Sequence, residues 1–292
     1  MNIFSLLRFI VSHPLNRQAK LAALGRFVRW QVSSRLMGEP IALPYVEGTR
    51  LLATNGMTGA TANYYCGLHE VTEMSFVLHA LRPGDFFADI GANIGSYSVL
   101  AAGAAGTRVI SVEPVPATFK HLMDNIRLND LSDRVEAICC GLSSQSGELQ
   151  FVSSLDTMNR VALPGEDLPT VTVPVRTLND ICGTSIPAII KIDVEGHEKP
   201  VLEGGSDTLA NEGVRAVLME TNQSGEKFGV SDAELMDIMA RHGFEPCDYA
   251  PFERTLKRQT KPQSNTIFVR DIAAMNAHCA ASHHYSLING SI

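Results

Sequence analysis

Short β-prone runs alternate with longer helical segments from about Val71 onward in this chain of 292 residues. Between two of these runs, Phe119, Leu122 and Ile126 recur with helical spacing. Such alternation predicts an α/β fold, with a doubly wound, mostly parallel sheet of about seven strands and helices on both faces. The runs that we expect to form strands are 86–90, 108–113, 134–140, 188–193, 214–220 and 265–270.

The N-terminal segment differs in composition from the rest of the chain. From Met1 to Gly38 there is no Asp or Glu, although Lys and Arg recur. Apolar residues stand at helical spacing in this segment, at Leu21, Leu24, Val28, Val32 and Leu36. We expect an amphipathic helix that packs on the main domain; the alternative is contact with a membrane surface or an acidic partner.

We therefore expect three parts: a basic helical extension at 1–45, a main domain at 46–270 and a polar tail at 271–292. The tail contains three histidines, His278, His283 and His284. We interpret it as a frayed end rather than a metal site.

Composition excludes several classes of protein. The net charge of −7 argues against a general nucleic-acid binder, because phosphate binding needs a surplus of Lys and Arg. Six cysteines are scattered without a C-x-x-C pair, so neither a zinc framework nor a secreted disulfide scaffold is indicated. No run approaches the roughly 18 uninterrupted apolar residues of a membrane span. We expect a cytoplasmic protein.

A glycine-containing turn follows the first predicted strand, in the run ADIGANIGSYS. Glycines let the backbone approach a ligand closely, and the N-terminus of the following helix favours negative charge. A carboxylate about 20 residues further on, at the end of the next strand, typically binds two ribose hydroxyls. The pattern predicts a nucleoside-bearing cofactor, with candidate residues Asp89, Gly91, Ala92, Asn93, Gly95 and Glu113.

The turn reads G-A-N-I-G and so lacks the G-x-G-x-x-G pattern of pyrophosphate-bridged dinucleotides. A dinucleotide-binding oxidoreductase on the same sheet is therefore a weaker alternative. The D-x-G-x-N-x-G form, with Glu113 at the end of the next strand, resembles the cofactor site of class I S-adenosylmethionine-dependent methyltransferases.

Three runs in order resemble the FkbM family of methyltransferases: FFADIGANIGSYSVLAA, VISVEPVPATFKHLMDNIRLN and IIKIDVEGHEKPVLEGG. The resemblance extends from about Tyr64 to Arg270, and K-I-D-V-E-G-H-E is its most specific part. It implies a Rossmann-like fold, S-adenosylmethionine as cofactor, and methylation of oxygen on a sugar, a glycan or glycolipid, or a small natural product. It also implies that Glu70 lies near the cofactor mouth. Ser144 stands where we look for an acidic or amide contact to the adenine.

Charged residues gather where two later strands are predicted to end. Methyl transfer to an alcohol requires an aligned acceptor and a base that takes its proton. The catalytic candidates are Asp193, Glu195, His197 and Glu220. We expect Glu198, by contrast, to be a solvated charge at the start of a helix.

Other chemistries remain as alternatives. Asp193, Glu220 and Asn222 offer the oxygen ligands that Mg²⁺ prefers, but displacement at a sulfonium needs no metal, and we do not favour one. A nucleic-acid methyltransferase would need a basic groove at the acceptor site, whereas the basic cluster lies at the remote N-terminus. A non-catalytic scaffold would have lost its cofactor site, whereas the candidate cofactor residues Asp89, Gly91, Gly95 and Glu113 are all present in this sequence. The segment 153–170 is expected to be an active-site loop or a linker to an added hairpin.

Overall fold

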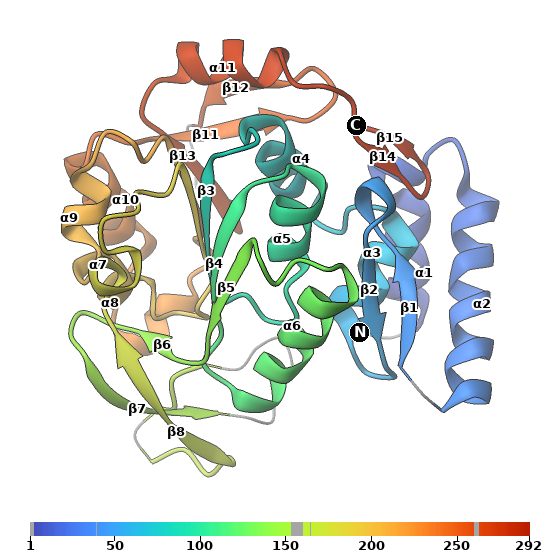
Figure 1. The fold of residues 1–292 in the computed structure, drawn as a ribbon, viewed down its shortest axis with the longest axis horizontal. Helices are drawn as coiled ribbons and strands as arrows, with labels where there is room; N and C mark the ends of the chain where they lie inside the picture. The colour runs from blue at the N-terminus through green and yellow to red at the C-terminus, as the bar shows by residue number, and fades with distance from the viewer. Residues whose placement is uncertain (1–2, 39, 153–159, 164, 260–262) are drawn as a thin grey trace.

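The main sheet of the computed structural model has eight strands in the order β12-β11-β13-β10-β9-β3-β4-β5 (Figure 1). The structure describes residues 3–38, 40–152, 160–163, 165–259 and 263–292. The strands of this sheet are β3 (Phe86–Ile90), β4 (Arg108–Val112), β5 (Val135–Ile138), β9 (Ile189–Ile192), β10 (Ala216–Glu220), β11 (Glu245–Ala250), β12 (Thr255–Arg258) and β13 (Asn265–Val269).

Five neighbouring strands, from β10 to β5, run parallel, and β13, β11 and β12 each run antiparallel to a neighbour. The doubly wound, mostly parallel sheet is thereby confirmed. It has eight strands rather than about seven, and β11 and β12 are the two that were not among the runs chosen from the sequence. Strand order reverses at β3, which has β4 on one side and β9 on the other.

Helices cover both faces of the sheet (Figure 1). Buried residues of α4, α5, α6 and α11 belong to one hydrophobic core, and those of α7 to α10 belong to a second. Helix α10 begins with a capping box, in which Ser231 and Glu234 each accept a hydrogen bond from the other's backbone N–H. The helices are α4 (Val71–Ala80), α5 (Ser96–Val99), α6 (Pro116–Leu128), α7 (Leu178–Cys182), α8 (Glu198–Glu203), α9 (Ser206–Ala210), α10 (Asp232–Arg241) and α11 (Ile272–Ala280).

Successive residues of the central strands face opposite cores. In β3, Phe87 belongs to the first core and Ala88 to the second; in β9, Ile189 and Ile190 divide in the same way. A strand that is buried on both faces has no solvent-facing position, which explains its continuous apolar sequence. Lys191 is a charged residue within such a strand, and it is only 7% exposed.

A three-stranded sheet lies beside the main one, formed by β6 (Gly141–Leu142), β7 (Gly147–Val152) and β8 (Thr170–Arg176). Strands β7 and β8 pair antiparallel, with Val152 opposite Thr170. They form a hairpin whose connecting segment is 153–169, of which 153–159 and 164 lie outside the described residues.

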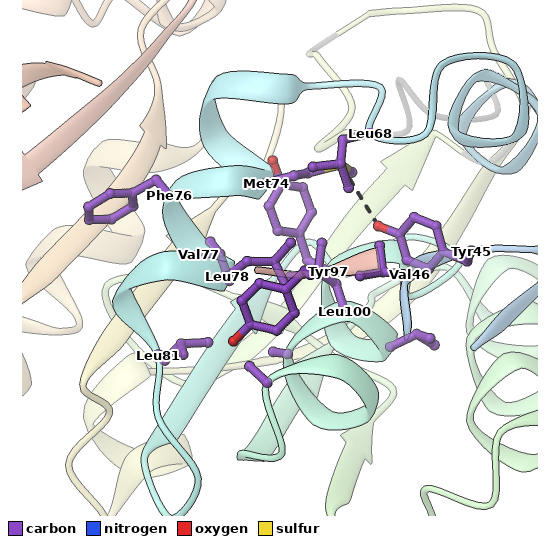
Figure 2. Packing of buried hydrophobic residues seen from close by; sticks show 14 of the residues in the cluster. Tyr45, Val46, Leu68, Met74, Phe76, Val77, Leu78, Leu81, Tyr97 and Leu100 are labelled. Atoms are coloured by element: carbon purple, nitrogen blue, oxygen red, sulfur yellow. Dashed lines mark hydrogen bonds between the residues drawn. The ribbon is translucent and has the colours of Figure 1, made fainter. Parts of the chain in front are cut away.

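The N-terminal part contributes α1 (Ile3–Ser12), α2 (Lys20–Met37), β1 (Ile41–Pro44), β2 (Arg50–Ala53) and α3 (Thr58–Cys66). Its buried residues belong to the same core as those of α4 and α5. Figure 2 shows Tyr45 and Val46 in one cluster with Met74 and Tyr97, and the Tyr45 hydroxyl lies 3.8 Å from the Met74 sulfur. The predicted helical extension is thus continuous with the core of the main domain.

Helix α2 presents a different face to the core from the one that the sequence indicated. It buries Ala23, Phe27, Trp30 and Ser34. Of the apolar residues chosen from spacing, Leu24 is half-buried, whereas the others are exposed, namely Leu21, Val28, Val32 and Leu36. The prediction was wrong because α2 is apolar on two opposite sides, and spacing alone does not choose between them. Within the described residues, no helix combines the length and apolarity needed to cross a bilayer.

The segment 271–292 is folded, so the expectation of a frayed tail was wrong. It forms α11 and a short hairpin of β14 (Ser286–Leu287) and β15 (Gly290–Ser291). Tyr285 and Ile292 are buried, and their backbones exchange hydrogen bonds of 2.8 and 3.0 Å. A few widely spaced apolar side chains anchor this segment in the core, although its overall composition is polar.

Candidate functional site

The glycine turn between β3 and α5 is held by the ends of two neighbouring strands. The N–H groups of Gly91 and Ala92 both donate to the carbonyl of Val112, each at 2.9 Å. Gly91 has a φ of 76°, and a Cβ at this position would lie 1.8 Å from the carbonyl oxygen of Asp193. The turn can therefore pass the end of β9 only because residue 91 has no side chain.

The side chain of Glu113 is hydrogen-bonded to this turn. Its Oε2 accepts a hydrogen bond from the N–H of Asn93 at 3.0 Å, and its Oε1 accepts one from Val115 at 3.0 Å. Asn93 itself has a φ of 51°, and its side chain accepts a bond from the N–H of Ile94 at 2.7 Å. Burial raises the pKa of Glu113 to about 7, although the two backbone bonds favour the ionised form.

Asp89 lies beneath the turn rather than on the cavity wall. It is fully buried, and Ser98 donates to its Oδ2 at 2.6 Å, while Ser98 is also bonded to Ser111 at 2.7 Å. Among the described residues, Oδ1 of Asp89 has no hydrogen-bond partner. Burial raises the pKa of Asp89, and the nearby Lys191 ammonium opposes that shift.

A cavity of about 1020 Å³ opens at the carboxyl ends of β3, β4, β9 and β10. This is the place where ligands bind in doubly wound sheets. The glycine turn, Glu113 and the segment 140–142 after β5 line it, together with the residues after β9. Trp30, Gln31 and Arg35 of α2 also line it. The sequence missed this contribution, since nothing in the spacing of α2 links it to strand ends far along the chain.

Three carboxylates meet on the cavity wall. One oxygen from each of Asp193, Glu195 and Glu220 lies within 4.8 Å of the others. The parallel pairing of β9 with β10 accounts for this, because it places both strand ends at one edge of the sheet. Glu195 has a φ of 54°, which puts it on the turn that leads into α8.

Lys191 lies directly behind this group. Its Nζ is 2.9 Å from Oδ2 of Asp193 and 5.0 Å from the centre of the Tyr97 ring. Burial by itself lowers the pKa of Lys191, but the carboxylates of Asp193, Asp89 and Glu70 outweigh burial and raise it. A lone lysine inside an apolar strand was the signal in the sequence that could have identified this residue.

Glu220 is the last residue of β10, and it is half-buried after four buried residues. Burial raises the pKa of Glu220 to about 8, with smaller contributions from Asp193 and Glu195. Asn222 donates to its Oε1 at 2.6 Å, and within the described chain its Oε2 has no partner. The side-chain Oδ1 of Asn222 accepts the N–H of Ser224 at 2.9 Å, and Glu195 supplies the third carboxylate beside Asp193 and Glu220.

His197 and Glu198 are more buried than the sequence indicated. The His197 Nε2 lies 3.2 Å from the Ser143 hydroxyl, and burial lowers the pKa of His197 to about 4. Glu198 is 1% exposed and accepts the N–H of Gly196 at 3.0 Å. The expectation that Glu198 is a solvated charge was therefore wrong, because the turn folds back over the first residue of α8.

Glu70, at the start of α4, also lines the cavity. The Tyr97 hydroxyl donates to its Oε2 at 2.7 Å, so Glu70 and Lys191 both contact Tyr97. The segment 140–142 provides the wall near Glu113, whereas Ser144 does not line the cavity.

Residues 89–246, which form most of the main domain, match the model of a known protein family. That family is described as the Methyltransferase FkbM domain. This range contains the glycine turn, Glu113 and the acidic cluster.

Several named proteins are similar in sequence to part of this chain. The hexuronic acid methyltransferase AglP of Haloferax volcanii is 32% identical over 151 residues, which cover 49% of this chain and 59% of the relative. The 31-O-demethyl-FK506 methyltransferase FkbM of Streptomyces tacrolimicus is 26% identical over 210 residues, covering 59% of this chain and 78% of the relative. The chain thus matches less than two thirds of the length of the Haloferax protein.

Among solved structures, the precorrin 8W decarboxylase of Methanobacterium thermoautotrophicum aligns with a TM-score of 0.42 and 15% identity. The alignment covers 69% of this chain and 90% of that one.

Proposed function

Because the chain belongs to the FkbM family of methyltransferases, we propose that it transfers a methyl group from S-adenosylmethionine to a hydroxyl oxygen. The acceptor is a sugar, a glycan or glycolipid, or a small natural product. One observation supports this above the others: a single cavity contains both the Glu113 turn and the carboxylates that follow β9 and β10. Two relatives named for a hexuronic acid and for an O-demethylated compound agree with a hydroxylated acceptor.

The residues present suit this cofactor. Glu113 would bind the ribose hydroxyls, and the segment 140–142 would contact the adenine. Gly91 and Asn93 give the turn between them its left-handed backbone, with φ of 76° and 51°, and both residues line the cavity. When bound, S-adenosylmethionine supplies an electrophilic methyl group on a positively charged sulfur.

Two carboxylates have different roles in the transfer. Glu220 accepts the proton of the acceptor hydroxyl, because its raised pKa makes it a stronger base than an ordinary glutamate. Asp193 orients the acceptor and supplies negative charge opposite a cationic cofactor. Lys191 holds Asp193 in place. His197 is less suited to accept a proton, since a pKa of about 4 makes it a weak base.

Transfer in this scheme is metal-free. The approach of three carboxylates within 4.8 Å favours bound Mg²⁺ as the second candidate mechanism. We prefer the first because the Lys191 ammonium, 2.9 Å from Asp193, already compensates part of the negative charge. The function is tested by incubating the protein with methyl-labelled S-adenosylmethionine and hydroxylated acceptors, with and without a chelator. Methyl uptake that requires added Mg²⁺ would replace this mechanism with the second.

Replacing Glu113 with alanine is expected to weaken binding of S-adenosylhomocysteine by about 1 to 3 kcal/mol, since a charged group's hydrogen bonds are removed. Isothermal titration calorimetry measures this. Glu136→Ala is the matched control, because Glu136 is an exposed carboxylate on β5. Equal affinities in the two variants would remove Glu113 from the ribose site.

The rate is expected to depend on the ionisation of Glu220. Only the deprotonated carboxylate can accept a proton, so kcat/KM should rise with pH and level off above about pH 8. Glu220→Gln should lower kcat by about 10²-fold and abolish this rise in the residual activity. A Glu220→Gln enzyme that retains the same pH profile would assign the base elsewhere.

A further inference from the structure

The outer side of α2 carries a stripe of exposed apolar residues, formed by Leu21, Val28, Val32 and Leu36. Their spacing of seven, four and four places them on one face of the helix. Leu21 is 85% exposed and Leu36 is 80% exposed. In Figure 1, α2 stands at the outer edge of the molecule, with its other side toward α3. A large apolar stripe exposed in this way marks an interaction surface.

Basic residues accompany the stripe. Exposed positive charges on or next to α2 and α1 come from Arg8, Arg17, Lys20, Arg29 and Arg35. The first 38 residues contain six Lys or Arg and no Asp or Glu, in a chain of net charge −7. The remainder of the chain is therefore more acidic than the whole, and the part that bears the stripe carries a net positive charge.

The apolar stripe and the basic residues together distinguish between two possible partners of this surface, a second copy of the chain and an anionic lipid surface. In a dimer formed through two α2 stripes, the basic residues of both copies would meet without an acidic partner from the same segment, which is unfavourable. An anionic lipid surface complements both features at once. Apolar side chains enter the boundary between headgroups and acyl chains, while Lys and Arg contact the headgroups.

We propose that α2 docks the protein on anionic membranes, with its axis in the plane of the interface and Leu21, Val28, Val32 and Leu36 inserted. The acidic remainder of the chain is repelled by the same surface, so electrostatics orient the N-terminal part toward the lipid. The inner face of α2 lines the cavity through Trp30 and Gln31, so the docking element is also part of the substrate site.

Vesicle sedimentation tests the proposal with the full chain. We expect binding to vesicles of equal parts phosphatidylcholine and phosphatidylglycerol, and at least about tenfold weaker binding to phosphatidylcholine alone. The double variant Leu21→Ser, Leu36→Ser should lose about tenfold or more in binding to the anionic vesicles. Binding should also weaken as sodium chloride is added, because salt screens exposed charges.

Phe252→Ser is the matched control, because Phe252 is an exposed apolar residue, 55% exposed, between β11 and β12. It should bind vesicles like the unmodified chain. Affinity for S-adenosylhomocysteine, unchanged in the double variant, shows that the variant is folded and separates this proposal from the proposed function. Equal vesicle binding by the unmodified and double-variant chains would overturn the proposal. So would a dimer that the double variant disperses, with no vesicle binding.

Discussion

Replacing Asp193 with asparagine is expected to lower kcat by about 10³-fold, the largest effect of any single side chain in the site. The substitution keeps size and hydrogen-bonding capacity but removes the negative charge. Lys191, 2.9 Å away and nearly buried, then loses the carboxylate with which it pairs, although Glu195 and Glu220 remain on the cavity wall. The local potential becomes less negative where a cationic cofactor must bind and where the acceptor must lose a proton.

This loss of negative charge has a signature that simple loss of packing does not produce. Affinity for the positively charged S-adenosylmethionine should fall more than affinity for S-adenosylhomocysteine, whose sulfur is neutral. Calorimetry with both compounds and a kcat measurement check this. The control is Asp237→Asn, at an exposed position of α10, which should leave all three quantities unchanged. If Asp193→Asn turned over at a normal rate, Asp193 would have no part in the mechanism.

Replacing Gly91 with alanine is expected to destabilise the protein by at least about 3 kcal/mol. Two costs combine at this position. The φ of 76° is unfavourable for a residue with a Cβ, and the added carbon would lie 1.8 Å from the Asp193 carbonyl oxygen. That oxygen belongs to the backbone, so no side-chain rotation relieves the overlap, and β3 and β9 must separate. Urea unfolding measures the loss.

Gly84 separates the two costs. It has a φ of 92°, but no atom lies within 4 Å of an added Cβ. Gly84→Ala should therefore show the backbone cost alone, about 1 to 2 kcal/mol. The excess in Gly91→Ala measures the close approach between the glycine turn and the end of β9, and S-adenosylhomocysteine binding should be lost only in that variant. Equal destabilisation in both variants would mean that the turn relaxes without disturbing β9.

The two predictions concern one junction. Gly91 belongs to the turn after β3, and Asp193 follows β9, about a hundred residues later in the chain. Their contact arises because β3 and β9 are neighbours in the sheet, where Asp193 N–H donates to the Ile90 carbonyl at 3.0 Å. The cofactor turn and the acidic cluster are thus held by the same pair of strands.

Much of this arrangement could be predicted before any coordinates. Continuous apolar runs that end in Asp89, Glu113, Asp193 or Glu220 are typical of buried parallel strands, and such strands deliver their last residues to one edge. The strands β11 and β12 were not predicted, and β12 is an edge strand of the sheet. The run from Glu245 to Arg258 mixes charged and apolar residues, so it lacks the continuous apolar pattern of the central strands.

Burial was the quantity that the sequence indicated least well. His197 and Glu198 are both polar and lie on a turn, yet neighbouring segments cover them and shift the pKa of each. Helix α2 is the clearest case, since two of its faces are apolar and only one packs on the core.

The order of residues along the chain determined the fold class, the glycine turn and the set of acids, because short-range periodicity and backbone freedom are local properties. Only the tertiary structure decided which face of α2 is covered, that Lys191 lies behind Asp193, and that α2 lines the cavity. These features depend on contacts between segments distant in sequence, and desolvation and charge pairing are set by such contacts rather than by residue type.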